Sequence, residues 1–215
     1  MRAGTTTGTS EVRLRRIPLG ALVRSESELG GFASLLRRGG VAAIPTETFY
    51  GLAADPMSEE GVRRIFAWKR REEKKPLLVL FGERGQLDAL GVRAGATVLD
   101  RFFALWPAAL TVVLPIEAPI PASLGAATLG VRLPSHPKLR DLLARTGPVT
   151  GTSLNRSGEP PCADPDAAEA LAGDAIDVLV DGGATPGELA STLVDATVDP
   201  PRLLRAGAFP WPPAP

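Results

Sequence analysis

Residues 40–52, GVAAIPTETFYGL, decide the fold of this chain. Their first half is a short apolar run between Gly40 and Pro45, which is typical of a buried strand. Their second half is rich in hydroxyl groups and closes at Gly51, so we expect a turn there. The sequence therefore predicts a buried strand from Val41 to Ile44 that delivers hydroxyls and backbone amides to one end of a sheet.

A cluster of cations follows this stretch, at the end of a predicted helix. Ser58 is a favourable N-cap for that helix, and seven Lys or Arg residues but only two acids lie between Val62 and Lys75. A strand end beside such a cluster suits a polyanion bound next to a small polar substrate. Runs of charge usually face water, however, so the cluster taken alone favours a solvated helix end.

Length and composition indicate one globular domain. A chain of 215 residues with 44% apolar and 22% charged residues can bury a full core. The net charge is zero, but cations crowd residues 13–84, whereas residues 157–201 contain ten acids and no Lys or Arg. An anion would therefore bind at a local patch and would not be attracted by the protein as a whole.

The two termini and the single cysteine indicate the cellular compartment of the protein and the bounds of its domain. Cys162 alone cannot form an internal disulfide, which fits the cytoplasm, and we expect it to be inert. No apolar run approaches the ~18 residues of a membrane span, and the first ten residues lack the apolar core of a secretory signal. We expect one domain over residues 12–208, with flexible tails at 1–11 and 209–215, the latter pinned by Trp211.

The order of elements predicts an α/β domain. Irregular alternation of helices and strands favours one twisted, mixed, open sheet flanked by helices over strict βαβ repetition. We expect helices at about 25–38, 58–71, 86–90, 96–105, 137–145 and 165–172. We expect strands at 12–17, 41–44, 77–81, 111–114, 128–133, 149–152, 177–180, 191–194 and 202–205.

Several enzyme classes find no support in the sequence. There is one His and one Cys, and no HExxH, CxxC, GxSxG, Walker A or GxGxxG motif. His136 stands between Ser135 and Pro137 at a predicted helix start, where a structural role is the better expectation. The residues that remain for chemistry are cations, hydroxyls and tight glycines at strand ends.

Seven motifs, taken in order, resemble those of the threonylcarbamoyl-AMP synthase family, the YrdC/TsaC group. They are PTETFYGL (45–52), KRREEKKPL (69–77), WPAALT (106–111), GVRLP (130–134), SLNRSG (153–158), STLVD (191–195) and RAG (205–207). The resemblance covers about residues 20–208, and seven motifs in register are far more specific than any one of them. It implies a YrdC-like domain of the short, single-domain type with a concave basic cleft.

The resemblance also implies a reaction and its participants. L-threonine and bicarbonate or CO2 would form N-carboxythreonine, whose carboxylate attacks the α-phosphate of ATP, with Mg²⁺ as cofactor. The product, threonylcarbamoyl-AMP, would pass to partner proteins that modify tRNA, and the resemblance leaves open whether tRNA itself binds. Such chemistry needs positioning and charge neutralisation and no protein nucleophile, which agrees with the residues present.

Site residues carry over by position in the motifs. Arg71 and Lys75 resemble the family's triphosphate contacts, with Lys69 in support, and we expect Lys69 and Arg71 to be catalytic. Asn155 is expected to brace its loop. The other nucleotide positions are matched by Thr128, Ser153 and Arg205, and the threonine positions by Thr48, Arg132 and Ser191; no residue is expected to bind a metal.

Departures from the family pattern keep two alternatives open. Glu47 replaces an Asp, Ala108-Ala109 replace Gly-Pro and Ala206 replaces a Pro, while Leu80 and Leu154 could reshape the amino-acid pocket. One alternative is an RNA-binding module without turnover, although few aromatics interleave the cations. The other is a diverged paralogue that adenylates another carbamate or hydrolyses the product.

Overall fold

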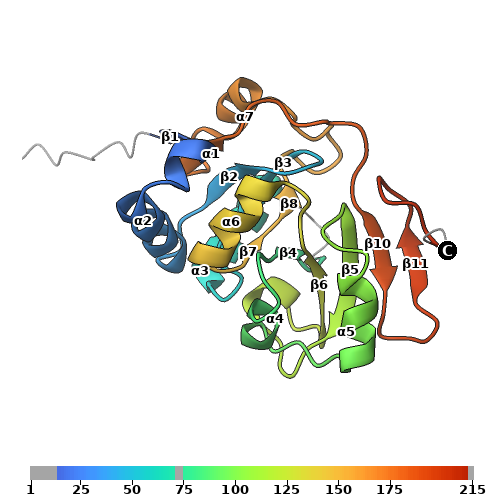
Figure 1. The fold of residues 1–215 in the computed structure, drawn as a ribbon. Helices are drawn as coiled ribbons and strands as arrows, with labels where there is room; N and C mark the ends of the chain where they lie inside the picture. The colour runs from blue at the N-terminus through green and yellow to red at the C-terminus, as the bar shows by residue number, and fades with distance from the viewer. Residues whose placement is uncertain (1–13, 71–74, 213–215) are drawn as a thin grey trace, which may run out of the picture.

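Two mixed β-sheets form the centre of the protein in a computed structural model that describes residues 14–70 and 75–212 (Figure 1). The first sheet has the strand order β1-β9-β2-β3-β8, and the second has the order β11-β10-β5-β6-β4-β7. Parallel and antiparallel neighbours occur in both sheets. The expected α/β class with mixed, open, helix-flanked strands is confirmed, but the strands form two sheets where one was expected.

The bounds of the elements are as follows. The strands are β1 (Arg15–Pro18), β2 (Ala42–Pro45), β3 (Tyr50–Ala53), β4 (Val79–Leu80), β5 (Leu110–Pro115), β6 (Thr128–Arg132), β7 (Val149–Thr150), β8 (Thr152–Ser153), β9 (Val178–Asp181), β10 (Thr192–Asp195) and β11 (Arg202–Arg205). The helices are α1 (Leu19–Leu22), α2 (Glu26–Arg37), α3 (Glu59–Lys69), α4 (Gln86–Ala89), α5 (Ala96–Phe103), η1 (Pro121–Ser123), α6 (Pro137–Thr146) and α7 (Pro165–Ala172). None of the helices within the described ranges is long and apolar enough to cross a membrane.

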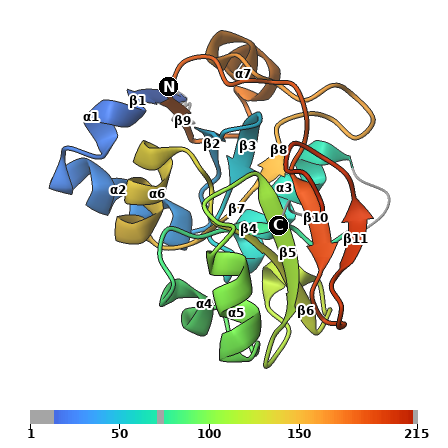
Figure 2. The ribbon, with the colours of Figure 1, turned by 45° about the vertical axis from the view of Figure 1, so that its right-hand side comes forward.

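Helices α1, α2 and α6 gather beside the first sheet (Figures 1 and 2). Helix α2 begins where the Ser25 side chain accepts a hydrogen bond from the Glu28 N–H, as expected of an N-cap serine. Its apolar face, with Leu29 and Phe32, joins Leu139 and Leu142 of α6 in one buried cluster. This cluster fixes β2 and therefore the turn that follows it.

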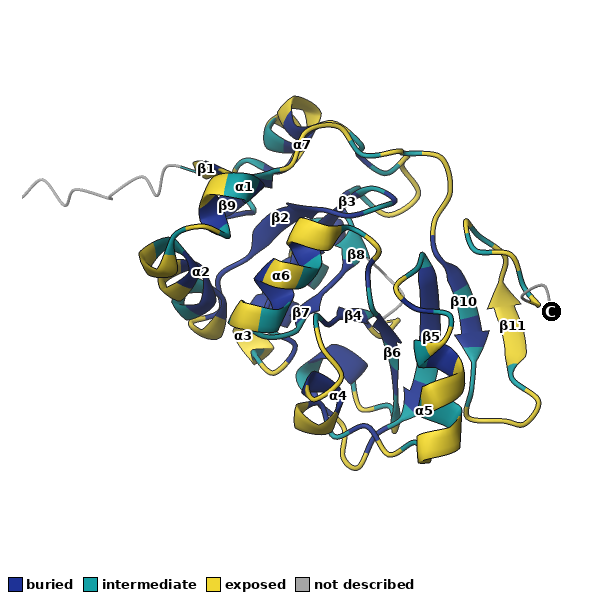
Figure 3. Ribbon diagram, in the orientation of Figure 1, coloured by how far each residue is buried: buried dark blue, intermediate teal, exposed yellow. Residues whose placement is uncertain are grey.

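The larger apolar cluster contains side chains of both sheets and holds the end of the described chain. Phe102 and Trp106 are buried in it, and the Trp211 ring stacks on Phe102 with centroids 6.3 Å apart. The Phe209 N–H donates to the Thr192 hydroxyl at 3.1 Å. Trp211 thus pins the residues up to 212, although the outermost strand, β11, is exposed along its length (Figure 3).

The structure differs from the sequence-based expectation at residues 50–53 and 149–152. The turn was expected to close at Gly51, but Tyr50–Ala53 are fully buried and pair antiparallel with β2 as strand β3. The expected strand 149–152 is divided, because β7 pairs with β4 and β8 pairs with β3. Gly151 stands at the division, where a Cβ atom would lie 2.7 Å from the Leu80 side chain, so only glycine fits there.

Candidate active site

A cavity of about 510 Å³ is lined by residues of both sheets. Its walls come from the turn between β2 and β3, from residues 75–78 and from parts of β3, β5, β6, β8, β10 and β11. Lys75, Arg132 and Arg205 bring positive charge to it, and no acidic side chain stands among the described lining residues. The volume is typical of small-molecule sites, and the charge suits an anionic ligand.

Seven of the predicted site residues line this one cavity. Those predicted for threonine, Thr48, Arg132 and Ser191, are buried. Those predicted for the nucleotide lie nearer to solvent: Thr128 and Ser153 are half-buried, and Lys75 and Arg205 are exposed. Arg71 lies outside the described residues, and Lys69 is placed behind the cavity wall, as described below.

The turn between β2 and β3 presents the hydroxyl of Thr48 to the cavity. The Thr46 hydroxyl donates to the Phe49 carbonyl at 2.7 Å and lies 2.9 Å from the Thr48 hydroxyl. A hydroxyl has one hydrogen to donate, so Thr48 must donate in the contact with Thr46. The lone pairs of Thr48 are therefore available to accept a hydrogen bond from a ligand.

Arg132 reaches the cavity from the end of β6 as a buried cation. Its side chain is 3% exposed, and its Nη1 atom is 3.6 Å from Oε1 of Glu47. Burial lowers the pKa of the Arg132 guanidinium, while the nearby Glu47 carboxylate raises it. A buried guanidinium with donors directed at a cavity is suited to bind a carboxylate.

Ser191 is held where β10 begins. Its hydroxyl lies 2.9 Å from the Thr111 hydroxyl on β5, and the Arg205 guanidinium donates to its carbonyl at 2.8 Å. Thr111 and Arg205 thus connect three strands of the second sheet around one serine. Arg205 remains exposed at the cavity mouth, where its other donors can meet a phosphate.

Lys69 holds the loop that carries Ser153. Its ammonium group is on a side chain only 4% exposed, and it donates to the Ser153 carbonyl at 2.5 Å and to the carbonyl and Oδ1 of Asn155 at 3.0 Å each. Asn155 Oδ1 also accepts from the Ser153 hydroxyl at 2.7 Å. Asn155 therefore braces the loop as expected, and Lys69 supports the cavity wall that carries Ser153 from behind.

Tyr50, the only tyrosine in the chain, fixes the back wall. Its hydroxyl donates to the Gly183 carbonyl at 2.9 Å and accepts from the Gly182 N–H at 3.2 Å. Burial raises the pKa of Tyr50 to about 12. Since Gly182 and Gly183 begin the segment that leads to Ser191, this tyrosine links β3 to the segment that carries Ser191.

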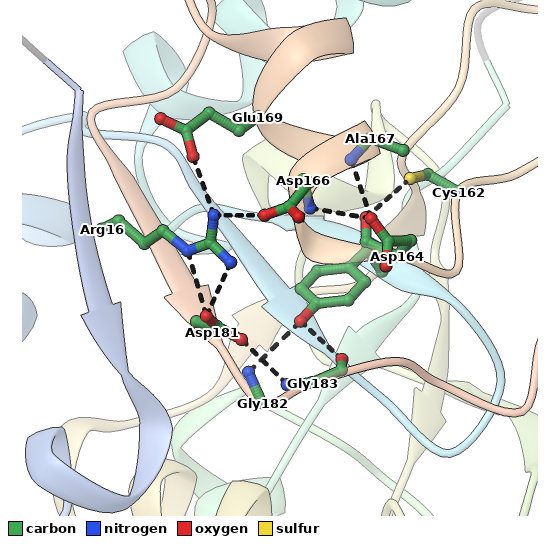
Figure 4. Close-up of polar contacts among 10 residues, drawn as sticks. Arg16, Cys162, Asp164, Asp166, Ala167, Glu169, Asp181, Gly182 and Gly183 are labelled. Atoms are coloured by element: carbon green, nitrogen blue, oxygen red, sulfur yellow. Dashed lines mark hydrogen bonds and ion pairs between the residues drawn. The ribbon is translucent and has the colours of Figure 1, made fainter.

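An ion cluster holds the same segment from outside (Figure 4). The Arg16 guanidinium contacts Asp166 at 2.6 Å, Asp181 at 2.8 Å and Glu169 at 3.1 Å, and these carboxylates raise its pKa. The Gly183 N–H, which donates to Asp181, lowers the pKa of that carboxyl, and Arg16 lowers it further. The cluster ties β1, α7 and β9 together behind Tyr50.

The residues that the sequence marked as structural have structural roles. His136 caps α6, with Nδ1 accepting from the Leu139 N–H at 3.2 Å. Cys162 is buried, and burial raises the pKa of its thiol. Leu80 and Leu154 are fully buried in the apolar clusters and are not among the residues that line the cavity, so they shape its wall only through their neighbours.

Sequence reasoning missed two contributors to the site. Tyr50 was assigned to a turn, although an aromatic residue before a glycine in an apolar run could have indicated a strand. Thr111 was assigned to a strand without a role, and no local signal shows that its hydroxyl meets Ser191 eighty residues later. Within the described ranges there is also no cluster of three His, Cys, Asp or Glu residues that could hold a metal ion.

Comparison with known proteins agrees with this geometry. A family profile described as telomere recombination, which groups Sua5, YciO and YrdC proteins, matches residues 34–207. The chain is 38% identical over 188 residues to the threonylcarbamoyl-AMP synthase of Pyrococcus abyssi, which covers 83% of this chain and 53% of that protein. It is 33% identical over 164 residues to the threonylcarbamoyl-AMP synthase of Coxiella burnetii, which covers 75% of this chain and 88% of that one.

A solved structure supports the same relationship. The crystal structure of P. abyssi Sua5 complexed with L-threonine superposes with a TM-score of 0.79 and 31% identity, and covers 92% of this chain and 58% of that chain. The chain thus spans about half the length of the Pyrococcus relatives that it matches. On the family profile and these identities, the chain belongs to the Sua5/YciO/YrdC family.

Proposed function

We propose that this protein is an L-threonylcarbamoyladenylate synthase, a nucleotidyltransferase that uses L-threonine, bicarbonate or CO2, and ATP. One observation carries the proposal: seven predicted site residues, from six separate stretches of the chain, line a single cavity in two groups. The group assigned to threonine is buried, whereas the group assigned to ATP lies at the mouth. That gradient fits a small amino acid inside and a larger, solvated polyphosphate outside.

The deep end supplies the groups that an amino acid needs. Arg132 would receive the α-carboxylate in a charge-assisted hydrogen bond, and the Thr48 hydroxyl would accept from the substrate's amino or hydroxyl group. Ser191 adds a second hydroxyl across the cavity, 2.9 Å from Thr111.

The mouth supplies charge neutralisation for phosphoryl chemistry. In the reaction, an oxygen of the N-carboxythreonine carboxylate forms a bond to the α-phosphorus of ATP. The bond from that phosphorus to the bridging oxygen breaks, and pyrophosphate leaves with the electron pair. Lys75 and Arg205, with Arg71, would stabilise the charge that develops on the phosphates, while Thr128 and Ser153 would bind the rest of the nucleotide.

Lys69 has a different task in this scheme. Because its ammonium donates to three loop oxygens, one on Ser153 and two on Asn155, we assign it as a positioning residue of the nucleotide wall. Magnesium ion would arrive with ATP, bound to its phosphates, since the described residues offer no carboxylate cluster to hold it. The ion would neutralise phosphate charge.

The product defines the further partners. Threonylcarbamoyl-AMP is a mixed anhydride, so a second protein must transfer its threonylcarbamoyl group to tRNA in the cytoplasm. The P. abyssi Sua5 structure with L-threonine and the threonylcarbamoyl-AMP synthases among the relatives support threonine as the substrate and the synthase activity. Direct binding of tRNA is not required by the proposal.

The test is turnover with defined substrates. The protein is incubated with ATP, Mg²⁺, bicarbonate and each amino acid in turn, and pyrophosphate and the adenylate are quantified. We expect both products only with threonine and bicarbonate. Turnover without threonine would refute the proposal, turnover with a different amino acid would favour a diverged paralogue, and tight, salt-sensitive tRNA binding without pyrophosphate would favour an RNA-binding module.

A further inference from the structure

Glu47 and Arg132 form a buried ion pair whose hydrogen bonds are incomplete. Their side chains are 12% and 3% exposed, and the closest approach of Oε1 to Nη1 is 3.6 Å. That distance allows electrostatic attraction but is too long for a hydrogen bond. Among the described residues, neither Glu47 oxygen nor the Arg132 Nε atom has a hydrogen-bond partner.

The two members of the pair differ in their access to a ligand. Arg132 lines the cavity, whereas Glu47 is not among the described residues that line it and its carboxylate oxygens are buried. Because Arg132 lines the cavity, its guanidinium can attract an anionic ligand that binds there. The same ligand would feel the charge of Glu47 without touching it.

The pair makes the deep end of the cavity nearly neutral. The other two cations on the described walls, Lys75 and Arg205, are exposed at the mouth, so the buried charges at the deep end are the Arg132 cation and the Glu47 anion. A carboxylate that approaches Arg132 is attracted by the guanidinium and repelled by Glu47. A zwitterion offsets that repulsion with its own ammonium group, and a simple carboxylate has nothing to offset it.

We propose that Glu47 is a specificity-determining residue, whose charge behind Arg132 makes the cavity select amino acids over simple carboxylates. The inference rests on the proposed function, because it takes Arg132 as the partner of the amino-acid carboxylate. Glu47 acts in two ways: it keeps the guanidinium in place when the cavity is empty, and it supplies the repulsion that rejects a ligand without an ammonium group. It does not contact the substrate itself.

The experiment compares two ligands that differ only in the amino group. (R)-3-hydroxybutyrate is threonine without its amino group, and its affinity is measured by calorimetric competition with L-threonine. The proteins are the wild type, Glu47→Gln, which removes the charge at nearly constant shape, and Glu47→Asp, which keeps the charge. We expect the preference for threonine to fall about tenfold in Glu47→Gln, as for a lost charge interaction in a low-dielectric site, and to persist in Glu47→Asp.

Four results would overturn the proposed role of Glu47. An unchanged preference in Glu47→Gln would overturn the proposal, and so would an equal loss in Glu47→Asp, since charge would then not be the cause. If Glu47→Gln does not fold, the wild type still tests the idea, because equal affinities for the two ligands would overturn it. A wild type that does not bind threonine at all would overturn the proposed function, and this role with it.

Discussion

Replacement of Lys69 by methionine should destabilise the protein through the Ser153 loop. The ammonium makes three hydrogen bonds to oxygens at 2.5–3.0 Å, and each hydrogen bond to a charged group contributes about 1.5–3 kcal/mol. Two effects reduce the sum: Ser153 and Asn155 are half-buried and can take up water, and methionine avoids the cost of burying a charge. We expect a net loss of about 3 kcal/mol in the free energy of unfolding.

Thermal unfolding by circular dichroism, with urea titration, measures this loss. For a protein of this size, 1 kcal/mol corresponds to about 2–4 °C in the midpoint, so the Lys69→Met midpoint should fall by about 6–12 °C. Lys138→Met is the matched control, because Lys138 is exposed on α6, and it should stay within about 0.5 kcal/mol of the wild type. Amide exchange should also become faster at Leu154, which lies between the two acceptor residues.

Two outcomes would contradict the role of Lys69. If Lys69→Met has the same unfolding midpoint as Lys138→Met, the three contacts do not stabilise the loop, and Lys69 is not a positioning residue. If the variant is destabilised but forms pyrophosphate at the wild-type rate under saturating ATP, the loop does not depend on Lys69 for its nucleotide-binding shape.

Three further predictions concern Tyr50, Arg132 and Arg71. In the folded protein, the tyrosinate absorbance of Tyr50, the single tyrosine, should appear only near its raised pKa of about 12, and a titration midpoint near pH 10 would contradict its burial. The contribution of Tyr50 to the free energy of unfolding should be fully present below pH ~10 and should fall as the pH rises toward 12, because only the unfolded state then loses the proton. Arg132→Ala should raise the KM for threonine at least tenfold (about 1.4 kcal/mol) with a smaller effect on the KM for ATP, and an unchanged threonine dependence in steady-state kinetics would count against its role. Arg71→Ala should abolish pyrophosphate formation while leaving the unfolding midpoint unchanged, and normal turnover would remove Arg71 from the triphosphate site.

Most helices and strands could be predicted because N-caps and apolar periodicity depend on residues close together in the sequence. Ser25, Ser58 and Asp164 cap the three helices that they precede, since a short polar side chain satisfies free N–H groups wherever it meets a helix start. The position of β1 at a sheet edge also follows from its exposed arginines, with only Ile17 of the strand buried. Periodicity and caps thus locate most elements, although the strand expected from residue 12 begins at Arg15, and α1 and β3 were not expected.

The partners of each strand could not be predicted in the same way. Residues 149–152 look like one strand, and only the close approach of Leu80 to Gly151 explains why the two halves pair with different sheets. Likewise, the cations after Val62 look alike in sequence. The structure buries Lys69 against loop oxygens and leaves Arg70 and Lys75 exposed, a distinction set by tertiary packing.

The two sheets are also interleaved along the chain. The first sheet takes β1 to β3 and then β8 and β9, whereas the second takes β4 to β7 and then β10 and β11. A continuous fragment that contains one complete sheet therefore also contains strands of the other, and a cut between β7 and β8 would divide both sheets. Unfolding should accordingly be all-or-none, and a ligand in the cavity, which contacts both sheets, should raise the stability of every strand together.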